Sequence, residues 1–208
     1  MGINFGNLNT GVPTPTEVAP TVGVTLNLEK NTILDLTKAA PGLTHAVLAA
    51  GWDVVSVGTD ADLDISVFML HENGKITSGS DVIFYNNKTA PGIALLGDNR
   101  TGAGDGDDEQ IEIDLNQIPS TVKRIVACVT IHDAVNRRQT FGMVENAYVR
   151  IVNKDTNQEL ARFNLKGDYS TDTAVIFSEV VRTDNGWAFH TIGEGKQGDL
   201  NTLASLYQ

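Results

Sequence analysis

Apolar and polar residues alternate along several short segments of the chain beyond residue 20. In the segment 63–69 an apolar side chain stands at every second position, and the same period of two recurs in residues 22–28 and 111–115. A period of two is typical of strands that bury one face. Further apolar runs of strand length predict strands over residues 46–52, 82–85, 122–131, 148–153, 159–164, 174–181 and 187–192.

Turn signals separate most of these predicted strands. Residues 72–75 and 184–186 each contain an Asn-Gly pair, which favours a tight turn between neighbouring strands. One short helix is predicted near the C-terminal end, with Asp199 as its N-cap. Its apolar face consists of Leu200, Leu203 and Leu206. Many short strands with little helix predict an all-β fold, a β-sandwich of two mainly antiparallel sheets with short helices.

The first 20 residues differ in composition from the rest. They are rich in Asn, Thr and Gly and contain Pro13, Pro15 and Pro20. Such segments bury little apolar surface, so residues 1–20 are predicted to form a flexible N-terminal arm. Residues 21–208 are long enough for one domain with a sizeable core.

Charge, cysteine content and hydrophobicity limit the partners and the cellular location that are expected for the protein. The formal net charge of −11 disfavours direct binding to nucleic acid or to an anionic membrane, and it suits a protein that collects cations. The single cysteine, Cys128, lies in an apolar run and is expected to be a buried structural thiol. The N-terminus lacks the pattern of a signal peptide, and no apolar stretch reaches the roughly 18 residues that span a bilayer. A cytoplasmic protein with no transmembrane segment is therefore expected.

A glycine-rich acidic segment at residues 97–109 carries the strongest chemical signal. Its candidate oxygen ligands are Asp98, Asn99, Asp105, Asp107, Asp108 and Glu109. Crowded carboxylates repel each other unless a cation joins them, and Arg100 is the single cation within the segment. Calcium binds about 6–8 oxygens in irregular geometry, whereas magnesium requires a nearly octahedral site. The segment therefore predicts a calcium site. It is not an EF-hand, because Gln110 and Asn116 stand where that motif has Gly and Glu.

Two further groups can supply ligands to the same ion or to a second one. Asp62 and Asp64 stand two residues apart in a predicted strand and therefore share one face. Asn86 and Asn87 follow the predicted strand 82–85 and offer neutral amide oxygens. Together with the acidic segment they predict one or two sites, and two Ca²⁺ ions are expected. The alternative is that all these residues form solvated turns, since Asp, Asn and Gly are common turn residues.

Four motifs occur in a specific order along the chain. They are Asp62-Leu63-Asp64-Ile65-Ser66, Phe84-Tyr85-Asn86-Asn87, the acidic segment 97–109, and Thr130-Ile131-His132-Asp133-Ala134. In this order they resemble the TerD family of tellurite-resistance and stress proteins, over residues 22–208. The resemblance implies a β-sandwich whose acidic loops bind calcium. It puts the acidic motifs of the family at Asp62, Asp64, Asn87, Asp98, Asp105, Asp107, Asp108 and Glu109.

The resulting interpretation is a binding protein and not an enzyme. The resemblance implies a stress-response module that holds calcium in its acidic loops. The ordered loops would then present a surface to a partner, such as another protein of the tellurite-resistance system. One alternative is a hydrolase that uses Asp62, Asp64 and Asp107 to activate water at a divalent ion. Another is an assembly protein in which the metal only joins loops.

Overall fold

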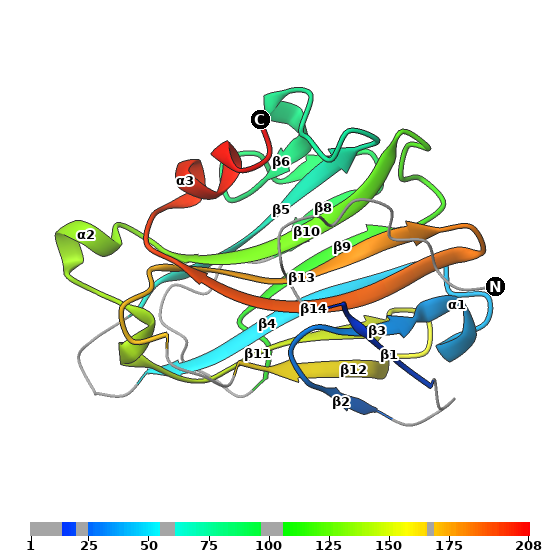
Figure 1. The fold of residues 1–208 in the computed structure, drawn as a ribbon, viewed down its shortest axis with the longest axis horizontal. Helices are drawn as coiled ribbons and strands as arrows, with labels where there is room; N and C mark the ends of the chain where they lie inside the picture. The colour runs from blue at the N-terminus through cyan, green and yellow to red at the C-terminus, as the bar shows by residue number, and fades with distance from the viewer. Residues whose placement is uncertain (1–13, 20–24, 55–60, 97–105, 166–168) are drawn as a thin grey trace.

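Two β-sheets face each other and enclose the apolar core (Figure 1). The computed structural model describes residues 14–19, 25–54, 61–96, 106–165 and 169–208. Sheet A contains, in spatial order, β1 (Thr16–Val18), β3 (Thr32–Asp35), β14 (Gly186–Lys196), β13 (Ala174–Thr183), β10 (Val122–Ile131), β5 (Leu63–His71) and β6 (Val82–Ile83). Sheet B contains β2 (Leu26–Leu28), β12 (Gln158–Asn164), β11 (Val144–Asn153), β4 (His45–Val54), β9 (Glu109–Asp114), β8 (Ile93–Leu96) and β7 (Thr89–Ala90). The predicted sandwich of mainly antiparallel sheets is confirmed, since β1–β3 and β2–β12 are the parallel pairs among the described strands.

Short helices connect or follow the strands. They are α1 (Leu36–Ala39), α2 (Ala134–Arg137), α3 (Leu200–Ser205) and the 3-10 turns Gly79–Asp81 and Phe141–Met143. Asp199 is the N-cap of α3, as predicted, because its carboxylate accepts a hydrogen bond from the backbone N–H of Thr202. Leu203 is buried, but Leu206 lies beyond the helix and is 52% exposed, so the predicted three-leucine face is only partly right. Among the helices that the structure describes, none is long and apolar enough to cross a membrane.

The alternation in the sequence determines which face each strand buries. In β5, Leu63 and Ile65 face the core between the sheets, while Asp64 belongs to the outer face of sheet A. β10 has the predicted limits and pairs with β5 in antiparallel register, with Val129 opposite Ile65. Cys128 of β10 is buried, and burial raises the pKa of its thiol, as expected for a structural cysteine.

A second, smaller core lies on the outer face of sheet A. Its buried members are Phe68, Leu70, Val82, Val126, Cys128, Ala174, Ile176 and Leu203. Leu203 comes from α3, and the ring of Tyr207 lies 5.4 Å from the ring of Phe68. These contacts fix the C-terminal segment across the outer face of β5 and β10, where Figure 1 shows α3.

Both predicted tight turns are present. Thr183 pairs with Gly186 where β13 passes into β14, and Gly186 has a φ of 138°. In the other turn the N–H of Gly74 donates to the carbonyl of His71, and Gly74 has a φ of 73°. Such positive φ values favour glycine, which explains why the Asn-Gly pairs predicted the turns correctly.

The predicted N-terminal arm of residues 1–20 contains one ordered element. Residues 16–18 form β1, which pairs in parallel with β3, and the N–H of Thr16 donates to the carbonyl of Asn31. Val18 packs against the main core. Backbone pairing with β3 and the packing of Val18 place this short strand at the edge of sheet A, and residues 1–13 and 20 lie outside the described residues.

Candidate functional site

Glu109 connects the two sheets at one end of the sandwich. It is the first residue of β9 in sheet B and is 3% exposed. Its Oε2 accepts a hydrogen bond of 2.5 Å from the backbone N–H of Ile65 in β5 of sheet A. β6, the edge strand beside β5, ends opposite Val67. The Glu109 carboxylate therefore accepts its hydrogen bond from a part of β5 that lies beyond the end of β6. The contact brings Glu109 next to the backbone of Asp64, another residue predicted for the site.

Asp62 and Asp64 are held by residues that follow β10. Asp64 is 8% exposed, and its Oδ2 lies 3.2 Å from Nδ1 of His132. The carbonyl of Asp62 accepts a hydrogen bond from the N–H of His132, and its carboxylate lies 3.9 Å from Nη1 of Arg137 in α2. His132 and Arg137 therefore orient the two aspartates.

Asp108 lies beside the end of β4 in sheet B. Its N–H donates to the carbonyl of Ala50 over 2.9 Å, and its Oδ2 accepts from the N–H of Trp52 over 2.9 Å. Since Ala50 also pairs with Glu109, these bonds extend the β4–β9 ladder into the acidic segment. Hydrogen bonds to β4 therefore hold the backbone of both Asp108 and Glu109.

Asp107 is bound by a different set of partners. Its carboxylate forms a two-pronged ion pair with Arg150 of β11, in which both N–O distances are 2.7 Å. Oδ1 also accepts a hydrogen bond from the hydroxyl of Tyr148, and Oδ2 accepts one from the amide of Gln110, both over 3.0 Å. The side chain of Asp107 is 3% exposed. Because donors engage both oxygens, Asp107 in this arrangement anchors the acidic segment to the outer face of sheet B.

Small residues in β4 allow this contact between strands that are not neighbours. Arg150 is opposite Ala49, and Ala49 is opposite Gln110 of β9 on its other side. Tyr148 is opposite Gly51, where an added Cβ would lie only 2.5 Å from the tyrosine ring. The side chains from β11 therefore pass over β4 and reach the acidic segment.

The ion pair belongs to a larger polar network on sheet B. Arg150 and Arg162 both donate to the carboxylate of Glu159, and the Arg162 guanidinium lies 4.0 Å from the centre of the Tyr148 ring. The hydrogen bond to Asp107 raises the pKa of Arg150, which therefore stays charged. Burial, and then the charge of Asp107, raises the pKa of Tyr148 to about 12, so its hydroxyl stays a donor at neutral pH.

The predicted amide ligands lie on the turn that leaves sheet A. The side-chain amide of Asn87 donates to the carbonyl of Val82 over 2.7 Å, and Asn86 is exposed. The neighbouring ring of Tyr85 lies 5.7 Å from the ring of His132, which connects this turn to the Asp64 side of the site. The other predicted ligands, Asp98, Asn99 and Asp105, lie outside the described residues.

The described part of the site is an acidic end of the sandwich, with carboxylates from both sheets. Oxygen donors of this kind suit Ca²⁺. Within the described ranges, no group of three or more His, Cys, Asp or Glu side chains is arranged to hold a metal ion. The metal-binding role of the predicted residues therefore stays a prediction.

Replacement of Arg150 by methionine is expected to lower the free energy of unfolding by about 2 kcal/mol, because the buried charge of Asp107 would lose its partner. Urea-induced unfolding measures this loss. The double variant R150M/D107N should recover part of it, since the uncompensated charge is then removed. Lys154→Met is the control, because it breaks an ion pair with Glu112 in which both side chains are partly exposed (45% and 30%). Equal losses in R150M and K154M would contradict the anchoring role.

Comparison with known protein families gives a match over most of the chain. A family model described as "TerD domain" matches residues 24–207. "Tellurium resistance protein TerD" of Serratia marcescens is 45% identical over 187 residues, which cover 88% of this chain and 97% of that protein. "General stress protein 16U" of Bacillus subtilis is 45% identical over 188 residues, with 88% and 97% of the two chains covered.

Solved structures share the fold. The crystal structure of SAV2460, a protein of unknown function, superimposes with a TM-score of 0.65 at 30% identity and covers 78% of this chain and 95% of that chain. A homologue of TerD from Streptomyces coelicolor, SCO6318, gives a TM-score of 0.62 at 24% identity, with 78% and 96% covered. Related chains of known structure therefore share the overall fold described above.

Proposed function

The chain belongs to the TerD family of tellurium-resistance and stress-response proteins, and we propose that it acts there as a calcium-binding module. Asp64, Asp108 and Glu109 are the described residues proposed to hold the metal, together with Asp98, Asn99 and Asp105 of the acidic segment. The observation that carries the proposal is the hydrogen bond between Glu109 and Ile65. It joins the acidic segment of sheet B to the backbone beside Asp64 in sheet A.

The chemistry of these donors fits a hard divalent cation. Asp64, Asp108 and Glu109 offer carboxylate oxygens, which calcium prefers, and the chain carries a net charge of −11. Asp107 fits less well, because Arg150 binds both of its oxygens. The proposal therefore assigns Asp107 to anchoring and leaves the other acids of the segment to the metal. Two Ca²⁺ ions remain the expectation.

Bound calcium would supply the positive charge that the crowded carboxylates need. The residues of the chain orient the acids: His132 and Arg137 hold Asp64 and Asp62, and Trp52 holds Asp108. The metal would then order the end of the sandwich and the surface around it. We propose that this surface binds a protein of the tellurite-resistance system in the cytoplasm, and that the module works by binding and not by catalysis.

Calcium titration tests the proposal. At free calcium 100-fold above its Kd, binding to the folded state alone raises the free energy of unfolding by about 2.7 kcal/mol. Asp108→Asn is expected to weaken the affinity about tenfold or more in isothermal titration. The control Asp155→Asn lies in the turn between β11 and β12, where its side chain is 57% exposed, and it should leave the affinity unchanged. Melting curves that superimpose in EDTA and in calcium would sink the proposal.

The hydrolase alternative makes a different prediction. It requires Asp62, Asp64 and Asp107 to activate water at a divalent ion. Hydrolysis of a generic phosphate ester in calcium, magnesium or manganese, lost in Asp107→Asn, would favour an enzyme. The other alternative is an assembly protein in which the metal only joins loops. In that case the affinity for a partner protein should be the same with and without a chelator. The binding-module proposal instead expects a chelator to weaken partner binding.

A further inference from the structure

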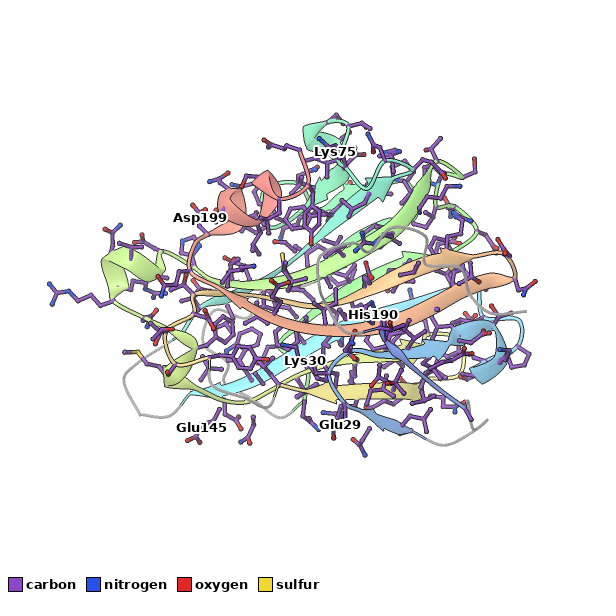
Figure 2. The ribbon with its side chains drawn as sticks, in the orientation of Figure 1. Glu29, Lys30, Lys75, Glu145, His190 and Asp199 are labelled. Atoms are coloured by element: carbon purple, nitrogen blue, oxygen red, sulfur yellow. The ribbon has the colours of Figure 1, made fainter. Side chains whose placement is uncertain are left out.

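An open groove of about 1150 Å³ lies on the outer face of sheet A. Its floor includes Asp64 and Ser66 of β5 and Thr130 of β10. The segment 76–85 borders it on one side, and α2 and the C-terminal residues 198–208 border it elsewhere. Figure 1 shows α2 and α3 beside the strands of this sheet, and Figure 2 labels Asp199 at the start of α3. We call this feature the α3 groove.

Exposed apolar side chains are concentrated at the α3 groove. Among the described residues, the large hydrophobic side chains that are exposed are Tyr85 (37%), Val135 (85%) and Leu206 (52%). Tyr85 and Val135 line the groove, and Leu206 lies in the C-terminal segment that borders it. Exposed apolar side chains gathered in one place are typical of an interaction site.

Acidic side chains outnumber basic ones in the lining of the groove. Asp64, Asp133 and Asp199 line it, and none of its described lining residues is Lys or Arg. His132 is paired with Asp64. The backbone hydrogen bond from Thr202 lowers the pKa of Asp199, so this carboxylate stays ionised at neutral pH. The groove is therefore complementary to a cation.

One buried polar group in the floor has no partner. Ser66 is 0% exposed and lines the groove, and its hydroxyl has no hydrogen-bond partner among the described residues. Buried hydroxyls of native proteins are normally hydrogen-bonded, so Ser66 gives the floor a polar group whose hydrogen-bonding capacity the described residues do not use. The borders are also fixed, since the N–H of Ile76 donates to the carbonyl of Tyr207 over 2.8 Å.

We propose that the α3 groove binds a segment of a partner protein that carries Lys or Arg beside apolar side chains. The apolar side chains of the segment would pack on Tyr85 and Val135, and its cation would lie near Asp133 and Asp199, the lining aspartates that are not assigned to calcium. A small inorganic cation would leave the apolar border unused, which is why the proposal names a polypeptide. The inference goes beyond calcium binding and does not require it.

A binding experiment with a defined probe tests this inference. The probe is a short fluorescein-labelled peptide in which lysine alternates with leucine, titrated with the full chain and followed by fluorescence anisotropy in EDTA and in calcium. Val135→Arg is expected to weaken binding about tenfold, because it puts a cation and a longer side chain at the border. The matched control is Asn116→Arg, which adds the same charge in the exposed turn after β9. It should leave the affinity unchanged.

Each other outcome overturns the inference. Equal losses in V135R and N116R would mean that the peptide senses only the net charge of the protein. Two variant peptides carry glutamate in place of lysine or serine in place of leucine. If either binds as tightly as the lysine-leucine probe, the proposed complementarity is wrong. It is also wrong if the probe does not bind at all. A dimer in sedimentation analysis that V135R dissociates would assign the groove to a second copy of the chain. Because the titration is done with and without calcium, failure here is separate from failure of the calcium proposal.

Discussion

Replacement of Glu179 by alanine is expected to lower the free energy of unfolding by about 3–5 kcal/mol. Glu179 of β13 is 1% exposed, and its carboxylate accepts hydrogen bonds from Nε of Arg124 in β10 (2.5 Å) and lies 2.8 Å from Nδ1 of His190 in β14. The acid thus joins three neighbouring strands of sheet A, and Figure 2 labels His190 on this sheet. Its removal leaves Arg124 without its buried partner. Urea-induced unfolding measures the loss.

A matched control separates this buried pair from an ordinary surface one. Glu194→Ala removes an acid that pairs with Lys196 in β14, where the two side chains are 51% and 35% exposed. Exposed pairs contribute little, so the free energy of unfolding should change by less than about 1 kcal/mol. A loss in E179A as small as that in E194A would contradict the claim that the buried acid connects the strands.

The same acid gives the protein a defined sensitivity to low pH. Burial raises the pKa of Glu179, but the hydrogen bond from His190 and the charge of Arg124 outweigh burial and bring the pKa below its ordinary value of 4.5. The unfolded chain therefore binds a proton more readily than the folded chain. The stabilisation is present above about pH 4.5 and is lost as the pH falls through the lower pKa of the folded state. As the pH falls through this range, the difference in free energy of unfolding between the wild type and Glu179→Gln should shrink, because protonated Glu and Gln are both neutral.

Local patterning predicted the long strands, but it missed β3 and the parallel pairings of β1 and β2. The period of two predicted β5 and its buried face, and the apolar run predicted β10 with its observed limits. β3 was not predicted because all four of its residues are buried, so the segment has no alternation to detect. The parallel pairing of β1 with β3, and of β2 with β12, joins segments by contacts at the sheet edges, which no local pattern contains.

The sequence predicted a set of candidate acids, but it did not predict how they are arranged in the structure. The sequence grouped Asp107 with Glu109, yet Asp107 binds Arg150, which is 43 residues away, while Glu109 reaches Ile65 in the other sheet. The alternation in residues 148–153 puts Tyr148 and Arg150 on one face, which was an available signal. Their partner could not be inferred, because it depends on β4 lying between β11 and β9 and on the small side chains of β4.

Glu109→Gln is expected to remove most of the stabilisation by calcium. In the wild type this stabilisation is about 2.7 kcal/mol at 100-fold excess over Kd, and in the variant it should fall below about 1 kcal/mol. Glutamine has nearly the same shape and can still accept the hydrogen bond from the N–H of Ile65, but it lacks the negative charge that calcium requires. Thermal unfolding in EDTA and in calcium, with the affinity from isothermal titration, measures the effect.

Glu112→Gln supplies the matched control on the same strand. Glu112 lies on the outer face of β9 and pairs with Lys154, so it is three residues from Glu109 but points away from Ile65. Both variants change the net charge by the same amount. A calcium response that is lost in E109Q and retained in E112Q would therefore depend on the position of the charge and not on its number. Equal responses in the two variants would contradict a site at Glu109, even if the protein binds calcium elsewhere.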